Sequence, residues 1–458
     1  MSGDWRRVER EIYARRGEHA IVPTLDRIAA LAALLGDPQR ACPVIHVTGT
    51  NGKTSTARMT ETLLRARGLR TGLYTSPHLS SMRERICIDG EPLSEEDFVA
   101  AYEDLAPYAA MVDGQQAVQL SFFELLTAMA FAAFADTPVD VAVIEVGLGG
   151  TWDATNIADG AVAVVTPVAI DHTAYLGDTV GAIATEKAGI IKPGAVAVLA
   201  RQSEAAAAAL ERRAAQVAVP VLTEGMDFAV TGRDLAVGGQ RLALSGLRGG
   251  YQDLRLPLFG AYQAQNAVCA LAAVEAFSGT GPLDEELVSQ AFAAMTAPGR
   301  LEVVRRSPVV IVDSAHNPAG MAASMAAVTE AFGFETLVAV LAVSADKDVP
   351  GMLGELEPAV SSLVVTRNSA SRSMDPGELE RLAEPVFGPD RVFAAPRLDD
   401  AIDTATALAD EAADGAGRAG AGILITGSTT TAGEARLLLG AAGAGRPAGG
   451  GLGGETAR

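Results

Sequence analysis

The stretch VIHVTGTNGKTSTARM, residues 44–59, is the feature that most restricts the fold. Mostly β-branched residues run straight into a glycine loop, and a helix-forming segment follows. This order predicts a buried strand, a tight loop and a helix, which together offer backbone N–H groups and a positive helix end to a phosphate. The strict P-loop pattern has a glycine five residues before Gly52, where this chain has Val47. The stretch therefore favours an α/β fold with a phosphate site of unusual form.

The loop contains the residue types that phosphate binding needs. Lys53 would reach the terminal phosphates of a nucleotide, and Thr54 or Ser55 would serve a metal ion. The alternative is an ordinary strand-to-helix turn with a solvated lysine. Gly-Lys-Thr at such a junction favours phosphate, but it does not distinguish a kinase, an ATPase and a ligase.

Other apolar, β-branched runs alternate with Ala- and Leu-rich helical windows. Near-continuous apolar runs are typical of strands buried on both faces of a parallel sheet, so we expect a doubly wound α/β domain. Its expected strands are 44–48, 139–146, 161–168 and 195–200, and its expected helices are 54–67, 118–135, 178–190 and 203–216. A small β-ribbon is expected over 224–258 and a helix over 263–277. A second α/β series has expected strands at 309–313, 337–343, 362–366, 391–395 and 422–427.

The length of 458 residues predicts two or three domains. We take Pro298-Gly299 as the boundary between an N-terminal domain over 1–298 and a smaller C-terminal domain over 299–440. The Gly- and Ala-rich tail, 441–458, is expected to be disordered.

The composition restricts the class of partner. A formal net charge of −20 argues against nucleic acid or an anionic membrane, because both would be repelled. The most apolar segment, 117–135, contains Gln119 and Glu124, so it predicts a buried helix rather than a membrane span. The N-terminal residues lack the apolar core of a signal peptide. We therefore expect a cytoplasmic protein that binds small molecules.

A carboxylate and a hydroxyl occur in two further motifs of the first domain. Glu145 lies inside an apolar run just before the glycines of 147–150, and a buried carboxylate there needs a partner such as Mg²⁺. Ser76, in Ser-Pro-His, would offer a hydroxyl to a cation and His78 would line a pocket, although a plain turn explains both. Arg83 and Arg85 suit a substrate carboxylate or a solvated face equally well.

A histidine and a lysine follow in DHTAYLG and EKAGIIK. Asp171-His172 is expected to close the strand of 161–168, which would bring His172 to the same sheet edge as Glu145, where α/β ligand sites form. Lys187 is expected near a helix end, where the helix dipole favours a cation. From these residues alone, a solvated lysine is the simpler interpretation.

The second domain has one comparable turn, VDSAHNPAGM, at 312–321. A strand is expected to end at Asp313 and a helix to begin at Pro318, a favoured first-turn residue. Asp313, His316 and Asn317 would therefore be available to a ribose or a phosphate. Capping of the helix by Asp or Asn is an equal alternative.

In this order the motifs resemble the folylpolyglutamate synthase/dihydrofolate synthase family, within the Mur-type ATP-dependent amide ligases. The resemblance covers about 15–435, and its motifs are TGTNGKTS, TSPHL, EVGLGGTWDATN, DHTAYLG, EKAGIIK, QAQNA, PGRLE, DSAHNPAG, DKD and TGST. It implies a P-loop ATPase domain with a parallel sheet and a small β-ribbon, followed by a Rossmann-like domain. The shifted first glycine resembles this superfamily's own form of the loop.

The resemblance implies a role for each matched position. For ATP the positions are Gly49, Thr50, Asn51, Gly52, Lys53, Thr54, Ser55, Asn266, Arg300 and Asp313. For two Mg²⁺ ions they are Ser76, Glu145, His172 and Lys187, the last as a carbamate. For the pterin pocket they are Ile21, Val22, Pro23, Phe123, Glu124, Trp152, Asp153 and Ala154. Lys53, Lys187, His172 and His316 would be the catalytic set, with His316 at the phosphates or the incoming glutamate.

The implied reaction adds L-glutamate to dihydropteroate, to the γ-carboxylate of reduced folates, or to both, through an acyl phosphate formed from ATP. Three positions depart from the family pattern: Thr54, Thr151-Trp152 and Thr429-Thr430. Trp152 places a large aromatic side chain beside the implied pterin pocket, which leaves the substrate preference open. The alternatives are a Mur-type cell-wall ligase and, in a different class, a P-loop kinase. We expect a monomer, because no separate interaction module is evident.

Overall fold

The computed structural model describes residues 3–18, 20–279, 281–416 and 420–441. The chain divides into two compact units. The first comprises Met1–Met295 and Ala326–Ala331, and the second comprises Thr296–Met325 and the chain from Phe332 onward. The predicted disordered tail lies outside the described residues, except for Ala441.

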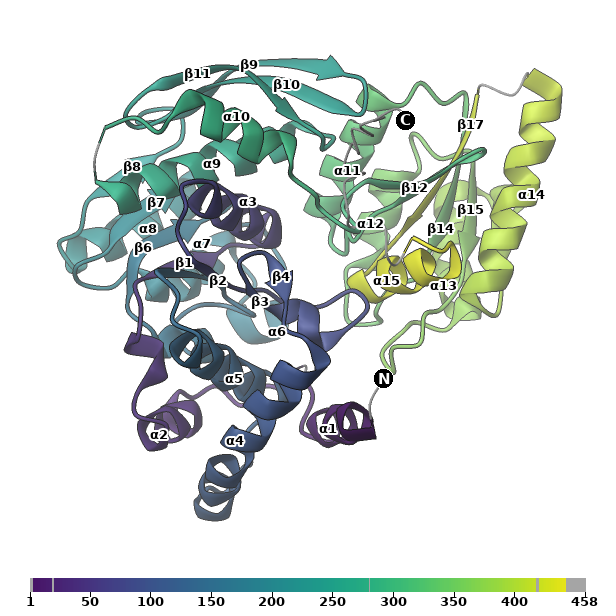
Figure 1. Cartoon of the computed structure of the whole chain (residues 1–458). Helices are drawn as coiled ribbons and strands as arrows, with labels where there is room; N and C mark the ends of the chain where they lie inside the picture. The colour runs from purple at the N-terminus through teal and green to yellow at the C-terminus, as the bar shows by residue number, and fades with distance from the viewer. Residues whose placement is uncertain (1–2, 19, 280, 417–419, 442–458) are drawn as a thin grey trace, which may run out of the picture. The chain divides into compact units, whose positions relative to one another are not determined.

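A mainly parallel sheet forms the centre of the first unit, with strand order β4-β3-β2-β5-β1-β6-β7-β8 (Figure 1). Its strands are β1 (Val44–Thr48), β2 (Thr71–Tyr74), β3 (Ile86–Ile88), β4 (Glu91–Pro92), β5 (Val141–Glu145), β6 (Gly160–Val165), β7 (Val196–Leu199) and β8 (Val221–Thr223). All neighbours from β2 to β8 pair in parallel, whereas β3 and β4 are antiparallel. The parallel strands therefore end at one edge, where the loops that follow them gather.

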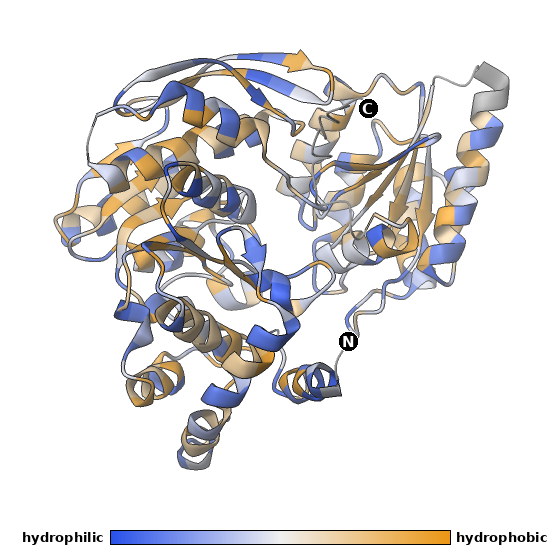
Figure 2. Cartoon of the chain, in the orientation of Figure 1, coloured by the Kyte–Doolittle hydropathy of each residue, from blue (hydrophilic) through white to orange (hydrophobic). Residues whose placement is uncertain are grey.

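Helices cover both faces of this sheet. One face carries α3 (Lys53–Ala66) and α9 (Ala261–Ser278). The other carries α5 (Phe122–Asp136) at the β2 side, and α7 (Val180–Lys187) with α8 (Glu204–Gln216) at the β6 and β7 side. This is the expected doubly wound arrangement, and the buried strands are hydrophobic along their length (Figure 2).

The buried helix predicted in the apolar segment 117–135 is α5, although it begins at Phe122, four residues later than predicted. Ser121 and Glu124 make a capping box at its start, which explains why the helix begins at Phe122. Over the part of the chain that the structure describes, no helix is both long and apolar enough to cross a membrane.

The first unit has further elements around this core. Helices α1 (Gly3–Tyr13), α2 (Asp26–Leu34) and α4 (Glu95–Gln115) pack on the α5 side, and α6 (Thr173–Leu176) precedes α7. The predicted ribbon is the antiparallel sheet of β9 (Ala229–Ala236), β10 (Gly239–Ser245) and β11 (Gly250–Leu256), beside α10 (Glu285–Ala293). Short 3₁₀ turns lie at Pro38–Arg40, Met82–Arg85, Ala154–Ile157 and Ala188–Ile190.

The second unit is a smaller α/β sheet with the order β12-β13-β17-β14-β15-β16. Its strands are β12 (Glu302–Arg306), β13 (Val309–Val312), β14 (Thr336–Leu341), β15 (Ser362–Val365), β16 (Val392–Ala394) and β17 (Ala421–Thr426). Its helices are α11 (Pro318–Ala331), α12 (Val349–Leu356), α13 (Pro376–Phe387), α14 (Leu398–Ala416) and α15 (Thr429–Leu438). The last six residues of α11 belong to the first unit. A 3₁₀ turn lies at Pro389–Arg391. The antiparallel edge strand β12 was not predicted; the other pairs are parallel.

Candidate active site

The glycine loop of 49–55 connects β1 to α3 and is held against the loop that follows β6. The backbone N–H of Thr50 donates to the Pro167 carbonyl at 3.0 Å, and its hydroxyl donates to the Ala169 carbonyl at 3.0 Å. Gly49 has φ +146°, and a Cβ there would lie 1.8 Å from Oγ1 of Thr166. Only glycine fits this position, because a side chain would meet both strain and a collision.

Two lysines converge on the carbonyl oxygen of Gly49. Nζ of Lys187 donates to it at 2.8 Å, and Nζ of Lys53 donates at 3.2 Å. Lys187 is only 3% exposed, so its interpretation as a solvated lysine is wrong. Burial first, and then the charge of Lys53, lower the pKa of Lys187 to about 7. Lys187 is therefore an amine of unusually low basicity next to the phosphate loop.

Glu145 joins this loop to the Ser-Pro-His turn. It is the last residue of β5 and is 1% exposed. Its Oε1 accepts a hydrogen bond from Oγ1 of Thr54 at 2.8 Å, and its Oε2 accepts one from the backbone N–H of Ser76 at 3.2 Å. A buried carboxylate and hydroxyl-bearing residues from three segments thus meet at the carboxyl edge of the sheet.

His172 lies in the loop after β6, but the predicted strand end there is wrong. β6 ends at Val165, because the backbone around Pro167 turns away to bind the glycine loop. His172 has φ +52°, directly precedes α6, and its side chain is 36% exposed. The charge of the neighbouring Asp171 raises the pKa of Lys187, against the larger lowering by burial and Lys53. Within the described ranges, no three His, Cys, Asp or Glu side chains gather in a set that could hold a metal.

Asn266, one of the residues predicted to bind ATP, packs against the glycine loop. Its Oδ1 lies 2.5 Å from the position that a Cβ on Gly52 would take, which explains the glycine at this point, where φ is +88°. The Asn266 side chain donates through Nδ2 to Oε1 of Gln263 at 3.0 Å. Gln263 thereby orients the amide of Asn266 toward the loop.

The predicted pterin residues on the loop after β5 have defined surroundings. A Cβ on Gly147 would lie 2.5 Å from the Phe123 ring, so that ring rests on the loop backbone. Asp153 is buried and accepts hydrogen bonds from the N–H of Leu148 at 2.9 Å and from the hydroxyl of Thr155 at 2.5 Å. Burial raises the pKa of Asp153 to about 6, and Ala154 beside it is buried as well. The Asp153 carboxylate therefore shapes the loop.

The Thr151-Trp152 departure fastens this loop to the segment that carries Lys187. The N–H of Thr151 and its hydroxyl both donate to the Glu186 carbonyl, each at 3.1 Å. The Trp152 side chain packs on the cluster formed by α7, α8, β6 and β7. Trp152, on the loop after β5, is thus half-buried against this cluster.

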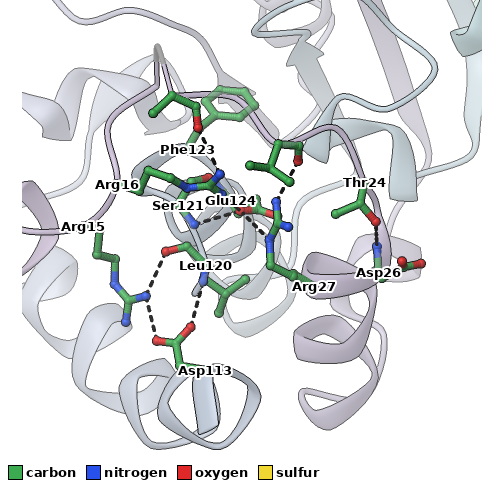
Figure 3. Close-up of polar contacts among 12 residues, drawn as sticks. Arg15, Arg16, Thr24, Asp26, Arg27, Asp113, Leu120, Ser121, Phe123 and Glu124 are labelled. Carbon is green, nitrogen blue, oxygen red and sulfur yellow. Dashed lines mark hydrogen bonds and ion pairs between the residues drawn. The ribbon is translucent and has the colours of Figure 1, made fainter. Parts of the chain in front are cut away.

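Segment Ile21–Val22–Pro23 connects to α5 through an ion pair (Figure 3). Nε of Arg27 donates to Oε1 of Glu124 at 2.9 Å, and its Nη2 donates to the Val22 carbonyl at 2.9 Å. The Val22 residue itself is 42% exposed. The apolar residues of this segment therefore lie at the surface, and the buried Arg27–Glu124 ion pair holds their backbone.

Arg85 and His78 belong to a second buried network. Arg85 is 2% exposed, pairs with Glu18, and donates from Nε to Nδ1 of His78 at 2.9 Å. Tyr13 contacts the other ring nitrogen of His78 at 3.0 Å, and the Arg85 guanidinium stacks 5.0 Å from the Phe122 ring centre. Neither sequence interpretation of Arg85 holds, because it is neither solvated nor available to a substrate carboxylate. It orders the turn that carries Ser76.

In the second unit, Asp313 follows β13 directly and organises its surroundings. Its carboxylate accepts hydrogen bonds from the N–H groups of Leu301 and Ala315, both at 3.0 Å, and from Oγ of Ser324 at 2.7 Å. Holding Leu301, which has φ +44°, fixes the turn at Arg300. Helix capping by Asn317 is confirmed, since its Oδ1 accepts from the N–H of Gly320 at 2.7 Å.

His316 is held through one of its ring nitrogens. Its Nδ1 lies 2.9 Å from the carbonyl oxygen of Ser314. A carbonyl oxygen can only accept, so Nδ1 donates in this hydrogen bond. The structure therefore brings Asp313, Arg300 and His316 to one turn of the second unit.

Comparison with known proteins decides the family. The model of the Mur ligase middle domain matches residues 47–274, and that of the Mur ligase glutamate ligase domain matches 299–429. Dihydrofolate synthase/folylpolyglutamate synthase of Mycobacterium tuberculosis is 51% identical over 454 residues, covering 94% of this chain and 93% of that protein. The chain belongs to the folylpolyglutamate synthase/dihydrofolate synthase family of Mur ligases.

Solved structures agree with this membership. The ADP complex of folylpolyglutamate synthase (FPGS) from M. tuberculosis superposes with a TM-score of 0.92 at 51% identity, over 95% of this chain and 98% of that one. An FPGS–AMPPCP–folate complex superposes at 0.80 and 33% identity, over 95% and 99% of the two chains. The predicted fold is confirmed, and the chain is an ATP-dependent ligase that forms C–N bonds, not a kinase. The matches favour a folate ligase over a cell-wall ligase.

Sequence reasoning missed the residues of this folate ligase that hold the predicted site residues in place. Arg27, Gln263 and Glu186 hold predicted site residues, yet none lies in a glycine loop or at a strand end. The one available signal was charge in an apolar context, as with Glu124 in the first turn of the most apolar helix. Such a carboxylate must be paired, but its partner is more than ninety residues away in the chain.

Proposed function

We propose that this chain joins L-glutamate to dihydropteroate, to the γ-carboxylate of reduced folates, or to both, with conversion of ATP to ADP and phosphate. The observation that carries the proposal is the position of Glu145, which binds the phosphate loop through Thr54 and the Ser-Pro-His turn through Ser76. The solved FPGS complexes with ADP and with AMPPCP and folate support both substrate classes.

The chemistry starts from a carboxylate, which is a poor electrophile. An acceptor carboxylate oxygen would attack the γ-phosphorus of ATP, the bond to ADP would break, and an acyl phosphate would form. Lys53 and the N–H groups of the glycine loop would offset the charge on the transferring group. The glutamate amine would then attack the acyl carbon, and phosphate would leave as the C–N bond forms and the amine loses a proton.

The residues of the first unit fit a Mg²⁺ requirement. Mg²⁺ prefers oxygen ligands, and the buried Glu145 carboxylate lies beside the Ser76 backbone and the Thr54 hydroxyl. Glu145 and Ser76, with His172 from the loop after β6, would hold the ions. When bound, Mg²⁺ would neutralise phosphate charge during transfer.

We propose a carbamate on Lys187. Its Nζ is buried and directed at the Gly49 carbonyl, at the base of the phosphate loop. The neutral amine would attack CO₂, an N–C bond would form and one proton would be released. The product is an anionic oxygen ligand in place of a cation, which suits a site for Mg²⁺.

The remaining assignments follow the family. We propose 1–298 as the ATP-binding domain and 299–440 as the glutamate ligase domain. Gly49–Ser55, Asn266, Arg300 and Asp313 would bind ATP, and His316 would act through Nε2 on phosphate or glutamate. A cytoplasmic monomer is part of the same proposal.

A product assay tests the proposal. Purified protein with ATP, Mg²⁺ and L-glutamate is given dihydropteroate or tetrahydrofolate, and both ADP and the glutamylated product are measured. We expect product with at least one acceptor, in equal amount to ADP. ATP turnover that continues in the absence of glutamate, or no glutamylated product from either acceptor, would overturn it.

A further inference from the structure

Glu124, predicted as a pterin contact, is already engaged inside the protein. It lies in the first turn of α5 and is 5% exposed. Its Oε2 accepts from the backbone N–H of Ser121 at 2.8 Å, and its Oε1 accepts from Nε of Arg27 at 2.9 Å. A second guanidinium, that of Arg16, has Nη2 3.7 Å from Oε2 (Figure 3). Both carboxylate oxygens therefore bind the chain itself, leaving the residue a poor candidate for substrate contact.

The two arginines that pair with Glu124 also donate hydrogen bonds to the backbone on either side of Ile21. Arg27 donates from Nη2 to the Val22 carbonyl at 2.9 Å, and Arg16 donates from Nη1 to the Ala20 carbonyl at 3.0 Å. The carbonyls on either side of Ile21 are thus held by guanidinium groups that share one carboxylate. We call Arg16, Arg27 and Glu124 the arginine clasp.

The held segment has little other support. Residues 20–25 lie outside helix and strand, and helix α2 begins only at Asp26. Val22 is 42% exposed and Pro23 is exposed. Exposed apolar side chains are not held in place by burial. The backbone of this segment is instead bound by a buried ion pair, which is destabilising unless its charged groups are paired and hydrogen-bonded. The clasp therefore fixes the shape of an apolar surface beside α5, the helix that also carries Phe123.

We propose that Arg27 and Glu124 are positioning residues that set the affinity for the acceptor substrate by fixing Ile21–Val22–Pro23, without contacting the substrate themselves. The inference rests on the proposed function, because the acceptor is the pteroate or folate substrate. The family resemblance implies that this segment belongs to the pterin pocket, and the inference adds how the segment is held in place. It concerns the affinity for the acceptor and not that for the nucleotide.

The test separates the acceptor KM from kcat in two conservative variants. Arg27→Lys keeps the charge but cannot bind Glu124 and the Val22 carbonyl with one planar fork. Glu124→Gln keeps an acceptor for the Ser121 N–H but removes the charge. We expect each variant to raise the acceptor KM about tenfold or more, with kcat, the ATP KM and ADP binding changed less than about threefold.

Asp113→Asn is the matched control. Asp113 pairs with Arg15 at 3.0 Å and accepts from the N–H of Leu120, so it ties the same N-terminal region to α4 without reaching residues 20–22 (Figure 3). This variant should keep the wild-type acceptor KM even if its melting temperature falls. If Arg27→Lys does not fold, Arg16→Lys replaces it, since Arg16 is more exposed and holds the Ala20 carbonyl.

The outcomes distinguish the two proposals. A wild-type enzyme that makes no glutamylated product refutes the proposed function. Normal wild-type turnover with an unchanged acceptor KM in the folded clasp variants refutes the clasp alone. A loss of kcat and ATP affinity together with acceptor affinity would also refute it, because that pattern indicates general disruption of the site.

Discussion

Thr54 donates a hydrogen bond from Oγ1 to Oε1 of Glu145 at 2.8 Å, which ties the first turn of α3 to the end of β5. Thr54 is one of the positions where this chain departs from the family pattern. Its hydroxyl orients the same carboxylate that we propose for Mg²⁺. Removing a group that orients a metal ligand typically lowers metal affinity or activity by about 10- to 100-fold.

Thr54→Gly should weaken Mg²⁺ binding, because Glu145 loses the donor that orients it. The Mg²⁺ concentration that gives half-maximal turnover should therefore rise by about 10-fold or more. Thr54→Ser should remain close to wild type, since it keeps the hydroxyl. The measurement is a Mg²⁺ titration of ADP release at saturating ATP and glutamate. Identical titration curves for Thr54→Gly and the wild type would show that the contact does not matter for the metal.

Lys187→Ala should lower turnover by at least about 100-fold while the protein still folds and binds ADP, because a metal ligand would be lost. Wild-type activity should also fall in CO₂-depleted buffer and return when bicarbonate is added. Glutamate-dependent ADP release checks both. Full activity of the alanine variant would rule out the metal-ligand role.

Gly49→Ala should destabilise the first unit by about 3 kcal/mol, because the new Cβ would collide with Thr166 Oγ1 on a backbone that disfavours any side chain. Gly194→Ala is the control, because Gly194 has φ +85° with nothing within 4 Å of an added Cβ. It should cost only the strain, about 1 kcal/mol. Urea unfolding measures both, and equal losses in the two variants would contradict the collision.

His46 should lower the free energy of unfolding as the pH falls. It is fully buried, and burial lowers its pKa from 6.5 to about 3. Between these values the unfolded chain binds a proton that the folded chain does not, so stability is lost as the pH falls below 6.5. The loss from this group is about 1.4 kcal/mol per pH unit.

The contribution of His46 to the pH dependence of stability is isolated by comparing the wild type with His46→Gln. Glutamine keeps a donor for Oγ1 of Thr155, which lies 2.9 Å from Nε2 of the histidine. Asp153 bonds to the same hydroxyl and its pKa is raised to about 6, so its own effect has the opposite sign between about 3.8 and 6. The stability difference between wild type and variant should therefore shrink from pH 7 to pH 5. Parallel stability curves over that range would refute the assignment.

The sequence predicted the elements whose evidence is local. The buried strand VIHVT, the glycine loop and the start of α11 at Pro318 lie where the pattern placed them, because burial periodicity and terminal residues act over a few positions. Short strands such as β2, and the antiparallel edge strand β12, were missed. A four-residue TGLY run differs little from a loop until its neighbour β5 pairs with it.

Lys187 shows where local evidence failed. A lysine at a helix end is normally solvated, and nothing in EKAG indicates otherwise. The lysine is buried because Thr151 bonds to the Glu186 carbonyl and holds the loop after β5 against this helix end, while Gly49 supplies the carbonyl for its Nζ. Those contacts join segments that are tens to more than a hundred residues apart.

By itself the sequence determined the α/β architecture, the glycine loop between strand and helix, the family, and Glu145 as a buried carboxylate that needed a partner. Only the tertiary structure decided that Thr54 and Ser76 hold Glu145, that Glu124 supports Arg27 and Arg16, and that Arg85 orders the Ser-Pro-His turn. The physical reason is that strand and helix formation depend on neighbouring residues. The pairing of a buried charge depends on which distant groups the packed sheet and helices bring within hydrogen-bonding distance.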